Sequence, residues 1–252
     1  MSLCFCTLMT RRAKIHGLPP GSLKALDVDV VIPACDAEAT IAALVRSIPS
    51  RLARSVIVVD AGSRDRTARV AEDAGAVVVR ESRRGVGAAV LRSIAHLSSL
   101  PKPPDVVVYL PGDGTADPAE IPTLVDPCKE SLFDLVIGSR ALSGGPIGAR
   151  YRARALIATG LIRAIYGHAY SDLGPFRAIR FPALVALGLR DPGPGWLVEM
   201  QVKALRRQLR IAEVPVSVRA GTAKSPLRAR MADTMRAGTR ALFQIVRHST
   251  AR

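Results

Sequence analysis

Three aspartates stand where short apolar runs of the sequence stop. Asp36 and Asp60 follow the first two such runs, and Asp113 follows the fourth, between two glycines that indicate an exposed turn. A carboxylate in such a place can accept hydrogen bonds from a nucleotide base or a ribose. It can also bind a hard divalent cation, which needs only one or two carboxylates when substrate phosphates supply the other ligands. The three residues are therefore candidates for binding a phosphorylated ligand and a metal ion.

Some neighbouring polar residues have a structural explanation. Asp117 directly precedes Pro118, the pattern of a helix N-cap followed by proline in the first turn. Ser63 or Asp65 can cap the helix that follows the second apolar run. These interpretations coexist with a ligand site, because they use different residues.

A basic turn precedes the third expected helix. Arg83 and Arg84 are followed there by Gly85 and Gly87. Arginines beside the backbone N–H groups of a helix N-terminus suit a phosphate, although solvated surface arginines explain the turn equally well. The third glycine of a dinucleotide-binding fingerprint is missing, so a site of that kind is not indicated.

These groups can meet only if the chain brings strand ends together. We expect strands at 28–32, 56–59, 77–79, 106–110 and 134–137, alternating with helices at 39–48, 64–74 and 87–97. This alternation predicts an α/β fold with a mostly parallel central sheet covered by helices on both faces. Ligands of such sheets bind beyond the carboxyl ends of the strands, where the three aspartates lie.

The second half of the chain has a different pattern. We expect helices at 151–166 and 196–208, a loop and short strand at 171–180, a strand at 211–218 and a basic amphipathic helix at 227–246. As domains, we expect a flexible extension at 1–26, one folded domain at 27–230 and a basic C-terminal helix at 231–252.

Composition limits the function classes. The 252 residues carry a formal charge of +15, and 48% are apolar, which is too many for a disordered chain. Aromatic residues reach only 4%, which argues against stacking on single-stranded nucleic acid. Twelve Lys and Arg but only two acids lie from residue 203 onward, a charge that suits nucleic acid, anionic lipid or phosphorylated substrates.

The sequence shows no clear sign of a membrane span, an export signal or a disulfide framework. No run reaches the roughly 20 apolar residues that a membrane span requires, and the N-terminus does not have the charge order of an export signal. Cys4, Cys6, Cys35 and Cys128 show no paired spacing. We therefore expect free thiols in a reducing cytoplasm.

Eight segments occur in the order found in family 2 glycosyltransferases. They read VVIPACDAEATI, VIVVDAGSRDRT, RRGVGAAVLRSI, YLPGDGTADPAEI, LVIGSR, SDLGPFRAIR, GWLVEMQVKALRR and AEVPVSVRAGTAKS. Over roughly residues 28–230 the chain resembles the branch that is similar to dolichyl-phosphate mannose synthase. The resemblance implies a GT-A fold, a nucleotide-sugar donor, inversion at the anomeric carbon, and Mg²⁺ or Mn²⁺ as cofactor.

The resemblance also implies roles on the donor side. Pro33, Asp36 and Asp60 match positions that hold the nucleoside, and Asp113 matches the last acid of the Asp-x-Asp metal motif. The other candidates are Glu38, Arg84 and Gly85 near the nucleotide, Arg140 at the diphosphate, and Arg219 and Lys224 in a basic loop that closes on the phosphates.

On the acceptor side the resemblance implies Asp172, Arg177 and Glu199. A hydroxyl acceptor requires a carboxylate base within hydrogen-bond reach, for which Asp172 is the first candidate and Glu199 the second. A lipid phosphate is already an anion and needs no strong base. Two structural explanations stay open: Glu199 pairing with Lys203 four residues on, and Asp172 bonding the backbone of its own turn.

Three departures from the family pattern leave the site with fewer acidic side chains. Pro111 replaces the first acid of the Asp-x-Asp motif, while Ala37 and Ala61 stand at two further positions that are usually acidic. Asp113 and the donor diphosphate would therefore be the main metal ligands.

We expect a metal-assisted inverting glycosyltransferase that moves a hexose from a donor of the GDP-mannose or UDP-glucose type to a lipid phosphate or a small hydroxyl acceptor. A non-catalytic protein that binds a nucleotide sugar or a lipid phosphate is the alternative, motivated by Pro111 and Ala37. Nucleic-acid binding is a third hypothesis, supported by charge alone, and nucleic acid is not an expected partner. The expected location is cytoplasmic, with peripheral contact to an anionic membrane and a homo-oligomeric state left open.

Overall fold

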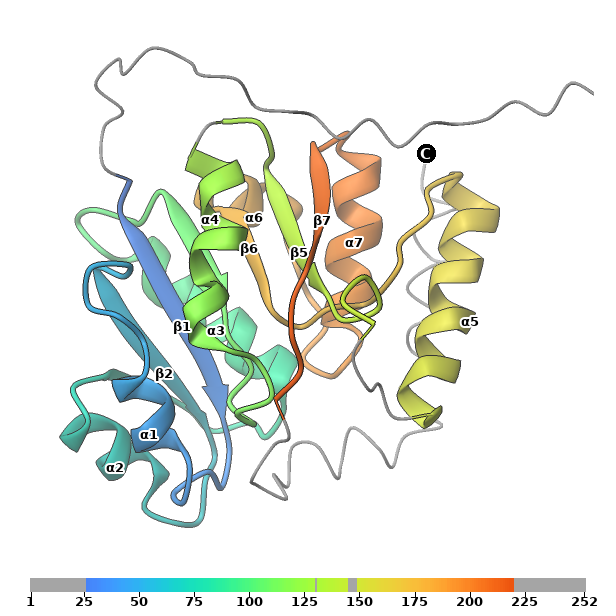
Figure 1. Ribbon diagram of the computed structural model, residues 1–252. Coiled ribbons are helices and arrows are strands. Elements are labelled where there is room, and N and C mark those ends of the chain that lie inside the picture. The colour runs from blue at the N-terminus through green and yellow to red at the C-terminus, as the bar shows by residue number, and fades with distance from the viewer. Residues whose placement is uncertain (1–25, 130, 145–148, 220–252) are drawn as a thin grey trace, which may run out of the picture.

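The computed structural model describes residues 26–129, 131–144 and 149–219 (Figure 1). Within them, seven strands form one sheet in the order β3-β2-β1-β4-β6-β5-β7. The strands are β1 (Val28–Ala34), β2 (Ser55–Ala61), β3 (Val77–Glu81), β4 (Val106–Tyr109), β5 (Leu135–Ser139), β6 (Arg177–Arg180) and β7 (Ile211–Pro215). Apart from Leu26, the predicted extension lies outside the described residues, as do the whole predicted helix at 227–246 and the predicted C-terminal segment at 231–252.

Helices cover both faces of this sheet (Figure 1). The cluster on one face includes residues of α1, α2 and α4, and the cluster on the other includes residues of α3, α5, α6 and α7. The helices are α1 (Ile41–Arg46), α2 (Thr67–Asp73), α3 (Val86–Ser98), α4 (Ile121–Lys129), α5 (Ala149–Tyr166), α6 (Phe181–Leu187) and α7 (Trp196–Arg206), with a 3₁₀ turn, η1 (Pro118–Glu120), before α4. The expected mostly parallel sheet with two helical layers is confirmed.

Strand β1 shows why these strands are continuous apolar runs. All seven of its residues are buried. Val30 packs in the cluster that contains Leu44 of α1, whereas Val31 packs in the opposite cluster with Val90 of α3. Because helices cover both faces, alternation with polar residues would bury polar groups on one side.

The helix predicted at 64–74 begins later than expected, as α2. The N–H of Arg64 donates to Oδ1 of Asp36 at 2.7 Å, and the N–H of Arg66 donates to Oε2 of Glu38 at 3.0 Å. These two carboxylates satisfy the backbone donors of a loop, so residues 64–66 do not join the helix.

Strand β6 is the exception to the parallel order. It lies antiparallel between β4 and β5. Its first residue, Arg177, is therefore at the same edge of the sheet as the carboxyl ends of β1, β4 and β5. The loop 171–176 that leads into β6 reaches that edge too, beside the residues that follow the parallel strands.

Two further findings bear on the expectations from sequence. Within the described part of the chain, no helix is both long and apolar enough to cross a membrane. Cys35 and Cys128 are buried free thiols, while Cys4 and Cys6 lie outside the described residues.

Candidate active site

One serine joins Asp36 and Asp60 at the carboxyl ends of β1 and β2. The N–H of Ser63 donates to Oδ1 of Asp60 at 3.1 Å, and its hydroxyl donates to the same oxygen. Its Oγ accepts from the N–H of Asp36 at 2.9 Å. Gly62 shapes this turn with a φ of +69°, a conformation that suits glycine. Among the described residues every hydrogen bond of the Asp60 side chain uses Oδ1, which leaves Oδ2 to accept from a ligand.

Arg84 holds Asp36 from the other side. Nη2 of Arg84 forms an ion pair with Oδ2 of Asp36 and lies 3.0 Å from Sγ of Cys35. The backbone N–H of Arg64, and after it the Arg84 guanidinium, hold the pKa of Asp36 below its usual value. Burial raises the pKa of the Cys35 thiol. The structure thus brings together two residues predicted for the donor side as a charged pair beside a neutral thiol.

Glu38 turns to the loop before α2. Its Oε1 accepts from Nε of Arg66 at 2.8 Å, and its Oε2 accepts from the backbone N–H of the same residue. Both carboxylate oxygens therefore hold protein groups, and a direct contact of Glu38 with a donor stays a prediction.

The N-terminus of α3 is covered by protein. The N–H of Ala88 donates to the carbonyl of Pro192 at 2.8 Å. A Cβ on Gly85 would lie 2.9 Å from that carbonyl oxygen, and one on Gly87 would lie 2.3 Å from the oxygen of Gly193. Both glycines permit this close backbone approach. The structure therefore gives Gly85 a packing role, and carbonyl groups stand where a phosphate was expected.

Asp113 follows β4 in a turn that touches β1. A Cβ on Gly112 would lie 2.6 Å from the carbonyl oxygen of Pro33, so glycine is needed for the turn to pass this close. The N–H and hydroxyl of Thr115 donate to Oδ1 of Asp113 at 3.1 and 2.6 Å. Within the described residues Oδ2 of Asp113 receives no hydrogen bond, so it can contribute to a metal site.

The chain beyond β7 returns to the same turn. The N–H of Arg219 donates to the carbonyl of Thr115 at 2.9 Å, and Nη2 of Arg219 lies 2.9 Å from Oδ2 of Asp117. Asp117 caps η1 through the N–H of Ala119 at 3.0 Å, as its place before proline predicted. The half-exposed Arg219 guanidinium is thus held near the turn of Asp113. Lys224 lies outside the described residues.

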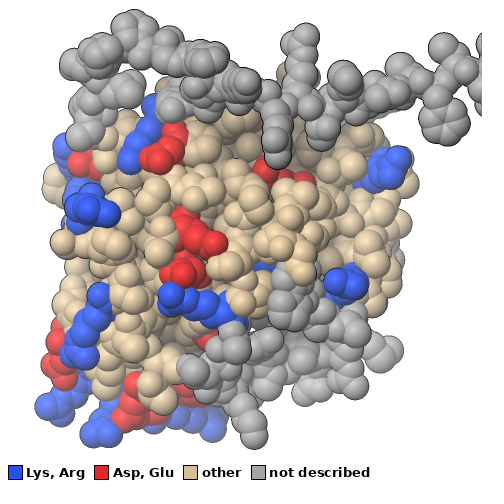
Figure 2. Space-filling view, in the orientation of Figure 1, with Lys and Arg blue, Asp and Glu red and all other residues tan. Residues whose placement is uncertain are grey.

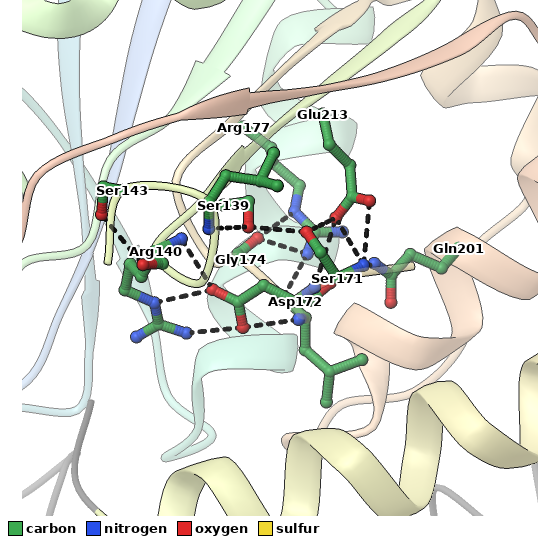
Figure 3. A network of polar contacts seen from close by, with 11 residues as sticks. Ser139, Arg140, Ser143, Ser171, Asp172, Gly174, Arg177, Gln201 and Glu213 are labelled. Carbon is green, nitrogen blue, oxygen red and sulfur yellow. Dashed lines mark hydrogen bonds and ion pairs between the residues drawn. The ribbon is translucent and has the colours of Figure 1, made fainter. Parts of the chain in front are cut away.

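Asp172 clamps Arg140, the residue that follows β5 (Figure 3). Nε and Nη2 of Arg140 donate to the two carboxylate oxygens at 2.9 and 3.2 Å, and its backbone N–H donates at 3.1 Å. The N–H of Leu173 donates to Oδ1 at 2.7 Å. The side chain of Asp172 is 1% exposed against 18% for Arg140. Asp172 therefore orients the arginine, and a role as base requires some of these bonds to break.

Arg177 is fully buried. Its Nε donates to the carbonyl of Gly174 at 2.9 Å, and its Nη2 donates to the carbonyl of Leu173 at 2.7 Å. Its guanidinium carbon lies 5.2 Å from the ring centre of Trp196, a cation–π distance. Arg177 thus supports the loop 171–176 from inside, and contact with a sugar requires an exposure that it lacks here.

Glu199 is buried in α7 and holds a loop. Its oxygens accept from the N–H of Arg190, at 3.0 Å each, and from the N–H of Asp191 at 2.8 Å. Nζ of Lys203 lies 2.7 Å from Oε1. The predicted pairing with Lys203 is confirmed, but Glu199 is interior rather than on the helix surface.

Sequence reasoning missed four polar residues that support the Arg140 clamp (Figure 3). Ser139 and Ser171 share a hydrogen bond of 2.7 Å between their hydroxyls. Glu213 of β7 accepts from the backbone of residues 171 and 172, and Nε2 of Gln201 donates to the carbonyl of Asp172 at 3.1 Å. The only signal in the sequence was an acid inside an apolar strand, Glu213.

The oxygen atoms that the protein offers at this site fit a cation that is bound partly by the protein and partly by a substrate. In the described ranges no group of three or more His, Cys, Asp or Glu could hold a metal by itself. Asp113 has one carboxylate oxygen to offer, and Pro111 offers no side-chain ligand. Oxygens of a bound diphosphate would have to complete the coordination of Mg²⁺ or Mn²⁺.

Comparison with known proteins finds glycosyltransferases. Residues 29–188 match the model of glycosyl transferase family 2. The chain is 33% identical to an uncharacterized glycosyltransferase of Mycobacterium tuberculosis over 193 residues, which are 75% of this chain and 84% of that protein. It is 31% identical to the glycosyltransferase AglJ of Haloferax volcanii over 194 residues, 75% of this chain and 62% of that protein.

The fold is similar to that of glucosyl-3-phosphoglycerate synthase from Mycobacterium tuberculosis. A crystal structure of that enzyme with Mn²⁺, UDP-glucose and phosphoglyceric acid superimposes with a TM-score of 0.71 and 26% identity, covering 94% of this chain and 86% of that one. A complex with Mn²⁺, UDP and phosphoglyceric acid gives 0.70 and 26%, covering 90% and 80%. The expected GT-A fold is confirmed. The sheet, the acids at its carboxyl edge and these matches agree: the chain belongs to glycosyl transferase family 2 and is a glycosyltransferase.

Proposed function

We propose that this enzyme transfers a hexose, with glucose the first candidate, from a uridine diphosphate sugar to a phosphate-bearing acceptor with the help of a divalent metal. The observation that carries the proposal is that Asp36, Asp60, Asp113 and Arg140 lie at one edge of the sheet, each at the carboxyl end of a parallel strand or in the turn that follows it. The similarity to an enzyme crystallised with Mn²⁺ and UDP-glucose supports UDP over GDP.

The proposed donor site runs along that edge. Asp60, through its open Oδ2, holds the nucleoside at β2. Asp36 lies next to it at β1, paired with Arg84, and lines the same site. Asp113 shares the metal with the diphosphate at β4, and Arg140 and Arg219 lie on either side of the phosphates. When bound, the metal neutralises charge on the leaving diphosphate.

Transfer breaks the bond between the sugar C1 and the diphosphate, so negative charge builds on the leaving group. A guanidinium held in place stabilises that charge without reorganisation, and the loss of one such preorganised donor typically costs about 2.7–4 kcal/mol of activation free energy. Arg140 fits this role because the buried carboxylate of Asp172 fixes its geometry before substrate arrives.

The acceptor that we propose carries phosphate. Both base candidates, Asp172 and Glu199, use their carboxylate oxygens for backbone N–H groups and for a cation. A phosphate oxygen that acts as the nucleophile is already an anion and needs no such base. A lipid phosphate, as in the branch similar to dolichyl-phosphate mannose synthase, and a small phosphorylated acid both meet this requirement.

The charge on the face of the protein seen in Figure 2 does not favour nucleic acid as the partner. On the face turned to the viewer in Figure 2, Lys and Arg are scattered and alternate with Asp and Glu. Most of the basic excess noted from residue 203 onward lies at 220–252, outside the described residues.

The test is UDP release from UDP-glucose, compared with GDP release from GDP-mannose, with MnCl₂ and with EDTA. We expect Mn²⁺-dependent release of UDP that Asp113→Ala lowers by roughly 100-fold or more. Asp126→Ala, which removes an exposed acid paired with Lys129, is the matched control. UDP binding by calorimetry without turnover would instead support the non-catalytic alternative, and full activity of Asp113→Ala would remove the metal role.

A further inference from the structure

We infer that Glu213 is a positioning residue for the transfer, acting through the loop at 171–172 on Arg140. This inference rests on the proposed function, because it takes Arg140 to contact the diphosphate. Glu213 is in β7, the strand at the end of the sheet, beside Ile137 of β5. It neither follows a strand nor touches Arg140 in any contact described above.

The first link is between Glu213 and the loop (Figure 3). The N–H of Ser171 donates to Oε1 and Oε2 of Glu213 at 3.1 and 2.9 Å, and its hydroxyl donates to Oε1 at 2.9 Å. The N–H of Asp172 donates to Oε1 at 3.2 Å. One carboxylate therefore fixes two consecutive backbone amides, which leaves the Asp172 backbone little freedom to rotate.

The second link runs from that backbone to the arginine. Asp172 holds Arg140 through both guanidinium and backbone hydrogen bonds. The hydroxyl of Ser171 also reaches Ser139, the residue before Arg140. Glu213 thus controls the place of Arg140 by two routes, one through the Asp172 carboxylate and one through the pair of serines.

The negative charge of Glu213 suits this task. Bonds from N–H and O–H donors to a carboxylate are shorter and stronger than bonds to a neutral acceptor. Glutamine keeps one acceptor oxygen, but it presents an NH₂ group where Oε2 now accepts from the Ser171 N–H. Glu213→Gln should therefore weaken the clamp without abolishing it, and Glu213→Ala should release it.

The experiment measures UDP release from UDP-glucose with MnCl₂ in Glu213→Gln, Glu213→Ala, Arg140→Ala and the double variant of the two alanine changes. We expect Glu213→Ala to lower kcat and kcat/KM together by up to about 100-fold, the size of effect that a misplacement of 1 Å can have. The kcat and kcat/KM of Glu213→Gln should lie between those of Glu213→Ala and those of the wild type. In the Arg140→Ala background the same Glu213→Ala change should lower kcat by no more than about 2-fold, because the guanidinium that Glu213 positions is gone.

Asp134→Asn is the matched control. Asp134 accepts from the N–H of Arg210 at 3.0 Å and pairs with its guanidinium, so it ties β5 to β7 at the opposite edge of the sheet. It should lose stability without a change in kcat.

The outcomes separate the two proposals. Unchanged kcat in both Glu213 variants, or an equal loss in the wild-type and Arg140→Ala backgrounds, overturns the positioning role while the proposed function stands. A wild-type enzyme that neither releases UDP nor binds it overturns the proposed function, and the positioning role falls with it.

Discussion

Replacing Glu199 should cost folding stability and leave the chemistry of the folded enzyme nearly intact. The structure makes this carboxylate an anchor: it accepts from two backbone N–H groups of the loop before α7 and pairs with Lys203. Its side chain is 1% exposed and that of Lys203 is 13% exposed, so the carboxylate is buried and the ammonium is largely shielded from water.

The magnitude follows from what each substitution leaves behind. Glu199→Ala leaves the Lys203 ammonium without its buried partner, and removing one partner of a buried ion pair costs about 3–5 kcal/mol of unfolding free energy. That is a large share of the roughly 5–15 kcal/mol that stabilises a typical domain. Glu199→Gln keeps an acceptor for the amides and loses the charge, so it should cost about 1–3 kcal/mol.

Urea unfolding measures the first quantity, and kcat at a temperature where each variant is folded measures the second. Lys203→Met is the control, because it removes the ion pair while Glu199 keeps its backbone donors. We expect kcat of Glu199→Gln within about 3-fold of wild type, a difference of less than 1 kcal/mol in activation free energy. A drop of 100-fold or more in kcat, with less than about 1 kcal/mol lost in stability, would refute the reasoning and return Glu199 to the role of a base.

Two further predictions test the edge of the sheet and its far end. Gly112→Ala places a Cβ 2.6 Å from the carbonyl oxygen of Pro33, so the turn of Asp113 must move. We expect weaker activation by Mn²⁺ and a kcat up to about 100-fold lower than that of the wild type. A variant with wild-type kinetics would show that the turn adapts. The hydrogen bond from the Arg210 side chain holds the pKa of Asp134 below its usual value. The resulting stability is present above the unfolded pKa of about 3.9 and is lost as the pH falls through the lower folded value. Below pH ~4, the unfolding free energy of Asp134→Asn should therefore fall less steeply with decreasing pH than that of the wild type. The difference should be less than about 1 kcal/mol because Arg210 is half exposed. Parallel curves of unfolding free energy against pH for the two proteins would contradict this.

The order of the elements and the edge that carries the site were predictable from sequence. The runs at 28–32, 56–59 and 106–110 are apolar without interruption because helices bury both faces of those strands, and this pattern is legible in residue types alone. The acids that follow them were placed correctly for the same reason: carboxyl ends of parallel strands meet at one edge whatever the rest of the chain does.

What side chains do at that edge depended on contacts between distant segments. Asp172, Arg177 and Glu199 are polar residues in or near loops, and the sequence alone is equally compatible with a base, a phosphate ligand or an anchor. Only the fold shows how fully protein groups occupy them. Asp172 meets Arg140 from the end of β5, whereas Arg177 and Glu199 are held mainly by loops nearby in the sequence. For Asp172 the antiparallel insertion of β6 decided this, since it brought the loop 171–176 into contact with Arg140 at the end of β5 and with Glu213 of β7.

The sequence by itself therefore determined the fold class and the edge of the sheet at which we propose that a ligand binds, because burial imposes local periodicities on the chain. The tertiary structure alone decided which carboxylates remain free to meet a ligand and which are occupied, because the place of a hydrogen-bond donor beside a carboxylate, whether near or far in the sequence, leaves no periodic trace. Within the part of the chain that the structure describes, Asp60 and Asp113 keep an open carboxylate oxygen, while Asp172 and Glu199 do not.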